Sequence, residues 1–292
     1  NRPARWDGPN AYWNSFIRIA GCASTHWSEM SALGRDGLSK AKAIARGRPD
    51  QPAQSRLRPR SPRVGNGGGV TAQRLADPEQ QTQRPSAANL KRLVKEIRAC
   101  RICKDDPVGV ALAHEPRPVL QVDWRARLAI SGQAPGTRVH ASGRPFTDPS
   151  GDRLRGWMGI GPETFYDAAR VAIVPMGFCF PGLDGKGGDL PPRRECAPAW
   201  RARVFAQLPD VELVLLVGQY AQRWQLTSGD LRRTSLTVTV RKWREILERD
   251  QRPRLLPLPH PSWRNNSWLK ANPWFEAELL PVLRAEVARL TA

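Results

Sequence analysis

Leu213-Val214-Leu215-Leu216-Val217 is an uninterrupted apolar run that ends at Gly218-Gln219. A strand with one face in water alternates apolar and polar residues, so a run without alternation indicates a strand that is covered on both faces. Three further short runs share this property, and helix-like or loop segments separate them: 128–130, 171–174 and 255–258. The pattern predicts an α/β fold with a central, mostly parallel four-stranded sheet flanked by helices.

Apolar residues at helical spacing occur near both ends of the same region. Leucine, valine and isoleucine fall on one face of a helix over residues 89–97, and leucine and valine do so over residues 274–290. Because amphipathic helices of this kind cover the faces of a sheet, we expect one folded domain over residues 86–292.

Residues 1–85 differ from this region in composition. They mix Gly, Pro, Gln, Ser and Arg, and they show no sustained apolar period. Such a segment cannot bury enough apolar surface to offset the entropy of the chain, so we expect a disordered basic arm. Its cysteine, Cys22, is interpreted as an incidental free thiol. The apolar stretch at 12–17 is interrupted by Arg18, so we expect no membrane partner and a cytoplasmic location, nucleoid-associated if the protein is bacterial.

Distinctive sequences follow each of the four predicted strands. In parallel α/β sheets, ligands bind outside the carboxyl ends of the strands, so these sequences mark the expected site. One glycine-containing turn would be a weak signal, whereas four unusual strand ends in order are a stronger one. The four are Gly132-Gln133-Ala134-Pro135-Gly136, residues 176–182, residues 218–221 and His260-Pro261-Ser262.

Four cysteines form a second pattern: Cys100, Cys103, Cys179 and Cys196. A close pair followed by two distant thiols suits a metal site with four thiolates better than it suits disulfides. Such a site can hold tetrahedral zinc or a [4Fe-4S] cluster, and the spacing does not choose between them. The alternative is four unconnected buried thiols.

These motifs together resemble the uracil-DNA glycosylase superfamily. The resemblance spans about residues 90–290 and is greatest to the iron–sulfur branches, families 4 and 5. It implies that the four cysteines ligate a [4Fe-4S] cluster, which braces the fold near DNA. The motifs that carry it are Gly132-Gln133-Ala134-Pro135-Gly136, Gly143-Arg144-Pro145-Phe146 with Ser150-Gly151, the cysteine spacing and His260-Pro261-Ser262.

Three side chains match the chemistry that a glycosylase requires. The extruded base needs an aromatic surface on which to stack, and Phe146 is the candidate. Cleavage of the N-glycosidic bond leaves positive charge on the sugar, which Asp148 would stabilise while orienting a water molecule, and negative charge on the base, which His260 would stabilise. Asp148 could instead cap a helix over residues 151–158. His140 could activate water or be a structural histidine.

Two positions depart from the nearest families. Gln133 stands where family 4 carries Glu, whereas the region of Asp148 is similar to the Asp-containing motif of family 5. Pro175 stands where relatives carry the Asn that reads uracil. We therefore expect backbone groups, or Asn265 and Asn266, to read the base.

The loop that contains Ser262-Trp263-Arg264 combines a bulky apolar group with a cation. It could enter the space that a flipped nucleotide leaves. Alternatively, Trp263 and Trp268 could pack this loop onto the domain. The formal net charge of +19 and the pI of about 11.0 favour a polyphosphate partner.

We therefore expect a DNA repair enzyme of base excision repair, a monomer that hydrolyses the bond between uracil and its sugar in DNA and leaves an abasic site. No lysine stands out as a Schiff-base nucleophile, so we expect a monofunctional enzyme. Two alternatives are a metal-stapled nucleic-acid-binding module that has lost the chemistry and a glycosylase for another deaminated base such as hypoxanthine.

Overall fold

The computed structural model describes residues 85–226 and 234–292. The predicted basic arm, apart from Pro85, and Cys22 lie outside the described residues. Within the described ranges, no helix is both long enough and apolar enough to cross a membrane.

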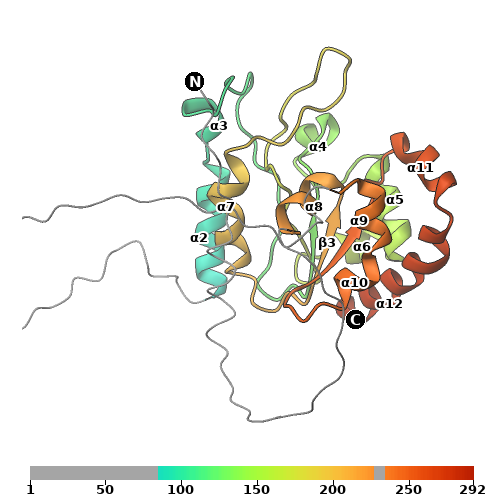
Figure 1. The fold of residues 1–292 in the computed structure, drawn as a ribbon. Coiled ribbons are helices and arrows are strands. Elements are labelled where there is room, and N and C mark those ends of the chain that lie inside the picture. Colours follow the sequence, from blue (N-terminus) through green and yellow to red (C-terminus); the bar gives the residue numbers. More distant parts are fainter. Residues whose placement is uncertain (1–84, 227–233) are drawn as a thin grey trace, which may run out of the picture. The chain divides into compact units, whose positions relative to one another are not determined.

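A four-stranded parallel sheet forms the centre of the described region (Figure 1). The strands are ordered β2-β1-β3-β4, so β1 and β3 are the inner pair. All four predicted strands are present, and the predicted fold class is confirmed. The strands are β1 Leu128–Ser131, β2 Val171–Ile173, β3 Leu213–Val217 and β4 Arg254–Leu258.

Helices and helical turns connect the strands and follow the last one. The α-helices are α2 Ala87–Arg98, α3 Ile102–Asp105, α4 Thr137–Ser142, α5 Pro149–Met158, α6 Pro162–Phe165, α7 Cys196–Phe205, α8 Gln219–Gln225, α9 Leu236–Arg241, α10 Trp243–Leu247, α11 Asn266–Ala271 and α12 Leu280–Thr291. A 3₁₀ turn, η2 Trp263–Asn265, precedes α11, and a π-helical turn, η3 Phe275–Leu279, precedes α12.

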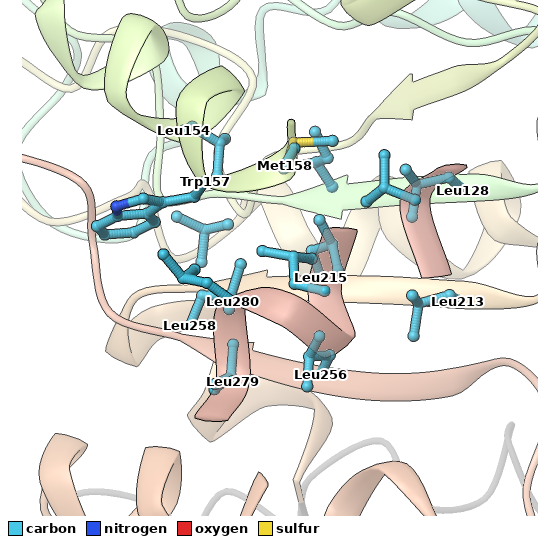
Figure 2. Packing of buried hydrophobic residues seen from close by; sticks show 14 of the residues in the cluster. Leu128, Leu154, Trp157, Met158, Leu213, Leu215, Leu256, Leu258, Leu279 and Leu280 are labelled. Atoms are coloured by element: carbon cyan, nitrogen blue, oxygen red, sulfur yellow. The ribbon is translucent and has the colours of Figure 1, made fainter. Parts of the chain in front are cut away.

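The strands are almost entirely apolar because helices cover both faces of the sheet. Alternate strand residues such as Ala129 and Val214 pack with α2, α7 and α8. Their neighbours, such as Leu128 and Leu215, pack with α5, α10 and α12 on the other face (Figure 2). In Figure 1, α2 and α7 lie on one side of the sheet and α5 and α12 lie on the other. Every residue of β1 and β3 is buried, which explains the absence of alternation.

The predicted helix over 274–290 is divided into η3 and α12. Pro281 lies in the first turn of α12. Proline has no N–H to donate, so the regular hydrogen-bond pattern of a continuous helix cannot run through this position. The sequence spacing identified the buried face correctly, since Leu279, Leu283, Val287 and Leu290 are all buried.

Ion pairs join the amino-terminal ends of three strands to α12. Arg127 donates to Glu212 with Nε and Nη2, at 2.8 and 2.6 Å. Arg254 donates to both oxygens of Glu286, at 3.0 and 2.6 Å. Arg289 contacts both carboxylates, each at 3.0 Å. Hydrogen bonds from Arg127 and Arg254 lower the pKa values of Glu212 and Glu286, respectively.

Candidate active site

The loops after the strands meet at the carboxyl edge of the sheet. The backbone N–H of Met176 donates to the carbonyl of Gly132 at 2.9 Å, and that of Gly177 donates to Gln133 at 3.0 Å. The N–H of Gly218 donates to Leu258 at 2.9 Å. These bonds tie the β1 loop to the β2 loop and the β3 loop to the end of β4. The sequence motifs that were predicted to share an edge therefore do so.

Phe146 is held directly over the β1 loop. A Cβ on Gly132 would lie 3.3 Å from Cζ of Phe146, so glycine allows the ring to approach the backbone. Phe146 has a φ of 54°, a left-handed conformation that is uncommon outside glycine. The hydroxyl of Tyr166 donates to its carbonyl at 3.0 Å, as does Arg155 at 3.3 Å. A side chain on Gly151 would collide with that same carbonyl. The ring is half-buried and fixed in place.

Asp148 caps the amino terminus of α5. Its Oδ1 accepts from the N–H of Gly151 at 3.1 Å and from the Ser150 hydroxyl at 2.6 Å. The capping alternative is thus confirmed for a helix that begins at Pro149. Both bonds use one oxygen. Within the described residues, no hydrogen bond is made to Oδ2, so capping leaves this oxygen for a further contact.

His260 lies at the end of β4 beside the turn after β3. Its Cβ and Cδ2 atoms would each be 3.5 Å from a Cβ on Gly218, whose φ is 84°. The N–H of Ser262 donates to Nδ1 at 3.3 Å. An Nδ1 that accepts leaves the proton of a neutral imidazole on Nε2. Asn265 donates to the carbonyl of His260 at 2.7 Å and so fixes the loop.

Burial lowers the pKa of His260, the charge of Asp148 opposes the effect, and Arg264 adds to it. The lowered pKa favours the neutral ring, which can donate from Nε2 without carrying a charge. Because the charge of Asp148 acts on the pKa of His260, the two side chains share one electrostatic environment. His260 and Asp148 were the two candidates for opposite roles in the chemistry, and the fold brings them to the same edge.

His140 lies in α4 and belongs to a separate aromatic group. Its ring centroid is 4.6 Å from that of His114 and 5.6 Å from that of Phe180. Its buried Nδ1 has no hydrogen-bond partner among the described residues. Burial lowers the pKa of His140, and the charges of His114 and Arg117 add to the effect. Within the described region, no contact joins His140 to Asp148 or His260.

The amide side chains proposed as base readers have protein partners. Asn265 holds the carbonyl of His260, and Asn266 accepts from Arg153 at 2.8 Å. Gln133 donates to the carbonyl of Leu190 at 3.5 Å. Ala134 and Pro135 complete the turn from Gly132 into Gly136, the residue before α4.

The two tryptophans of the late loop differ in environment. Trp263 is 72% exposed, and the Arg264 guanidinium lies 5.7 Å from its ring centroid. Trp268 instead donates to the Thr237 hydroxyl at 2.8 Å and packs edge-to-face on Phe275 of η3. Arg153 donates to the carbonyl of Ser262 at 3.1 Å. The packing alternative thus describes Trp268, whereas Trp263 projects from the loop.

Asp189 is a carboxylate of this edge that the sequence analysis missed. It pairs with Leu183 in an antiparallel bridge. A Cβ on Gly136 would lie 3.3 Å from its Oδ2. Burial raises the pKa of Asp189, Arg264 opposes this rise, and Asp148 adds to it. The glycine-rich turn at 185–188 indicates a hairpin, but nothing local in the sequence shows where the hairpin points.

The four cysteines are free thiols from three separate segments. Trp200 Nε1 lies 3.3 Å from Sγ of Cys100, and the N–H of Phe178 lies 3.3 Å from Sγ of Cys196. Burial and the charge of Glu195 raise the pKa of Cys103, and the charge of Arg193 opposes the rise. Burial likewise raises the pKa of Cys179 to about 12, against a backbone hydrogen bond from Arg117. The sulfurs of Cys100 and Cys196 therefore each have an N–H donor.

A buried cation lies beside this group. Arg201 is 2% exposed and donates to the carbonyls of Val174 and Pro175, at 2.6 and 3.1 Å. It also donates to the Ser131 hydroxyl at 2.9 Å. Its Nε has no partner, and none of the described carboxylates pairs with it. Burial lowers its pKa to about 9, and Cys196 is the neighbour that opposes the shift.

The grouping of the side chains and the chemistry of their surroundings give different answers on whether these residues fit a metal group. In the part of the chain that the structure describes, no three His, Cys, Asp or Glu side chains are grouped so as to hold one metal ion. The donor chemistry does suit an anionic thiolate cluster, because N–H donors to sulfur are the usual outer partners of such groups. A buried arginine without a carboxylate also suits a neighbouring group of negative charge.

A comparison with protein families gives a match to the sequence model of the uracil DNA glycosylase superfamily. The match covers residues 121–284, which is more than half of the 292 residues. It includes all four strands and the loops that carry Phe146, Asp148 and His260. Cys100 and Cys103 lie before the matched range, so the match does not address the iron–sulfur branch. By this match and by its fold, the chain belongs to the uracil DNA glycosylase superfamily.

Proposed function

We propose that the protein is a monofunctional DNA glycosylase that removes uracil from DNA and leaves an abasic site. Family membership supports a DNA glycosylase-like function. The observation that carries the proposal is the placement of an aromatic ring and a neutral histidine at neighbouring strand ends. Phe146 packs on the loop after β1, His260 packs on Gly218 after β3, and β1 pairs with β3.

Base capture would use the ring of Phe146. A glycosylase must extrude the nucleotide from the stack before it can reach the glycosidic bond. The half-buried ring gives the flipped base a surface for stacking, and its fixed backbone avoids an ordering cost on binding. The β1 loop would supply backbone groups from Gly132 to Gly136 to the edge of the base.

Bond cleavage would use the two groups on either side of the bond. When the C1′–N1 bond breaks, its electron pair leaves with uracil, and the Nε2–H of His260 would donate to the resulting anion. Asp148 would stabilise the positive charge on the sugar through Oδ2. Preorganised groups of this kind stabilise a transition state more strongly than mobile water does. Within the described residues, no lysine makes a hydrogen bond or ion pair with Asp148 or His260, in keeping with water as the nucleophile.

DNA would be held by charge and by the projecting loop. The chain carries a formal net charge of +19, which favours binding to phosphates. Trp263 is exposed beside Arg264, so it can enter the stack that the flipped nucleotide leaves. We propose Ser262-Trp263-Arg264 as this wedge.

We also propose that Cys100, Cys103, Cys179 and Cys196 hold a [4Fe-4S] cluster. The N–H donors to the sulfurs of Cys100 and Cys196 and the buried Arg201 support the assignment. When bound, the cluster would supply a structural link between the segments that carry the four thiols, and no part of the bond cleavage.

A single-turnover assay tests the proposed activity. Oligonucleotides with uracil, hypoxanthine or thymine at one position, single- and double-stranded, are incubated with excess protein and then cleaved with alkali. We expect strand cleavage with uracil and none with thymine. Cleavage with hypoxanthine alone would assign a different substrate, and DNA binding without cleavage would identify a binding module.

A further inference from the structure

A hairpin brings a second carboxylate to the carboxyl edge of the sheet. The N–H of Asp184 donates to Gly188 at 2.7 Å, and that of Leu190 donates to Gly182 at 2.9 Å. The Asp184 carboxylate accepts from the N–H groups of Lys186 and Gly188, both at 2.8 Å. The turn is thus closed by its own bonds. Asp189 follows it, and its carboxylate is free to serve another purpose.

Asp189 lies against the β1 loop. Its Oδ2 would be 3.3 Å from a Cβ on Gly136, so a larger residue there would press on the carboxylate. The bond from Gln133 to Leu190 joins the same loop to the same hairpin. The carboxylate is thereby placed beside the loop on which Phe146 packs.

The two carboxylates of this edge differ in what they already do. Asp148 is committed through Oδ1 to capping α5. Asp189 makes no hydrogen bond or ion pair with any residue that the structure describes. Of the two, the Asp189 carboxylate is thus the one with both oxygens available to a ligand at this edge.

We propose that Asp189 accepts the proton of the water that attacks the sugar. This deepens the proposed function and depends on it. As the C1′–N1 bond breaks, the water oxygen bonds to C1′ and one water proton passes to the Asp189 carboxylate. The bond's electron pair leaves on uracil, whose charge the Nε2–H of His260 stabilises. Asp189 later releases the proton to solvent, so atoms and charge balance.

The charges around Asp189 suit a proton acceptor. Burial and the neighbouring Asp148 and Asp184 raise its pKa, while Arg264 opposes the rise. A base is more effective when its pKa lies nearer to the working pH, provided that it stays ionised. Asp148 already accepts two hydrogen bonds with Oδ1, from Gly151 and Ser150, and is committed by them to the cap of α5.

The test compares Asp189→Asn with the matched variant Asp184→Asn, both in the full chain. Asn at 184 keeps the oxygen that closes the turn and removes the same charge from the hairpin. The rate of single-turnover uracil excision is measured from pH 5 to 9. The DNA affinity and the melting temperature of each variant are measured as well. For Asp189→Asn we expect an excision rate about 10²-fold lower, the scale of general-base catalysis. The decrease in the parent's rate on the acidic side of its pH profile should be absent from this variant. Affinity and melting temperature should be unchanged.

A second variant separates catalysis from structure. Formate should restore part of the rate of Asp189→Ala, because it supplies a carboxylate, and it should not affect the parent. A rate for Asp189→Asn within about 3-fold of the parent, with an unchanged profile, would overturn the assignment, on the scale of general-base effects. Equal slowing by Asp184→Asn would also overturn it. A parent that excises no uracil would contradict the proposed function instead.

Discussion

Phe146 and Gly132 are in contact across the mouth of the β1 loop, with Cζ of the ring 3.3 Å from the position of a Cβ on the glycine. A methyl group at 132 would press on the ring, and the ring cannot retreat easily because its backbone carbonyl is held by Tyr166 and Arg155. The pair therefore fixes how far the ring stands above the backbone.

Phe146→Ala should impair both base capture and excision. We expect a loss of about 1–3 kcal/mol, the range for one base stacked on an aromatic side chain. Single-turnover rates at several protein concentrations separate capture from cleavage. Phe146→Tyr is the matched control and should retain most of the activity. Equal activity of Phe146→Ala and the parent would place the base elsewhere.

Asp148→Asn should slow excision by about 10²-fold or more, the scale for removing one preorganised charge-stabilising group. Asn is a good helix cap, so the melting temperature should change little. Asp148→Ala should lose the same activity and also about 1 kcal/mol of stability with the cap. His140→Ala is the comparison variant. Near-full activity of Asp148→Asn together with an inactive His140→Ala would show that the chemistry uses His140 and not Asp148.

His260→Gln should also slow excision by about 10²-fold, since it removes the proposed donor to the uracil anion. The same variant tests the lowered pKa. The unfolded histidine binds a proton below about pH 6.5, whereas the folded one resists it. Stability from this group is therefore present above pH 6.5 and is lost as the pH falls through the folded pKa. Urea unfolding from pH 8 to 5 should show a larger loss for the parent than for His260→Gln; parallel curves would contradict the shift.

Arg289→Met should lower the free energy of unfolding by about 0.5–1 kcal/mol at pH 7, because the pairs with Glu212 and Glu286 are partly exposed. These carboxylates have lowered pKa values in the folded state. Their contribution is present above the unfolded pKa of about 4.3 and is lost as the pH falls below it. Denaturation at pH 7 and pH 3 should thus show a difference that shrinks in acid. Arg244→Met, whose pair with Glu278 spans 3.7 Å, is the control.

Purified protein with the proposed cluster should be brown, with iron and sulfide in equal amounts. Cys179→Ser should lose iron and solubility, since binding of the metal group and folding are coupled. Arg201→Met should retain the four thiols but hold iron less firmly during chelation. Cys22→Ser is the control and should leave the iron content unchanged. Colourless protein with stoichiometric zinc would overturn the iron assignment.

The strands and the location of the site could be predicted because their signals are local. Apolar runs identified all four strands, and parallel strands place their carboxyl ends at one edge, which brought the motifs of Phe146 and His260 together. Asp189 and Arg201 could not be predicted. Asp189 lies against Gly136, and Arg201 donates to the carbonyl of Val174. Both partners are distant in sequence, and neither composition nor spacing indicates such contacts.

The roles of side chains in the loop after β4 depend on tertiary contacts that the sequence does not show. Asn265 and Asn266 were expected to read the base because their amides follow the histidine, yet each amide has a partner in the folded loop. The two tryptophans of that loop have the same chemistry, and only tertiary contacts, with Thr237 and with Phe275, distinguish Trp268 from the exposed Trp263.

The left-handed backbone at Phe146 has a consequence for how the sequence can drift. Glycine would adopt this conformation without strain, so a change to glycine would relax the chain while deleting the aromatic surface. The ring also packs edge-to-face on Phe165, with centroids 5.9 Å apart, so the same change would remove contacts with the core. Residue 146 therefore combines an unfavourable backbone conformation with a side chain that both the core and the proposed pocket use.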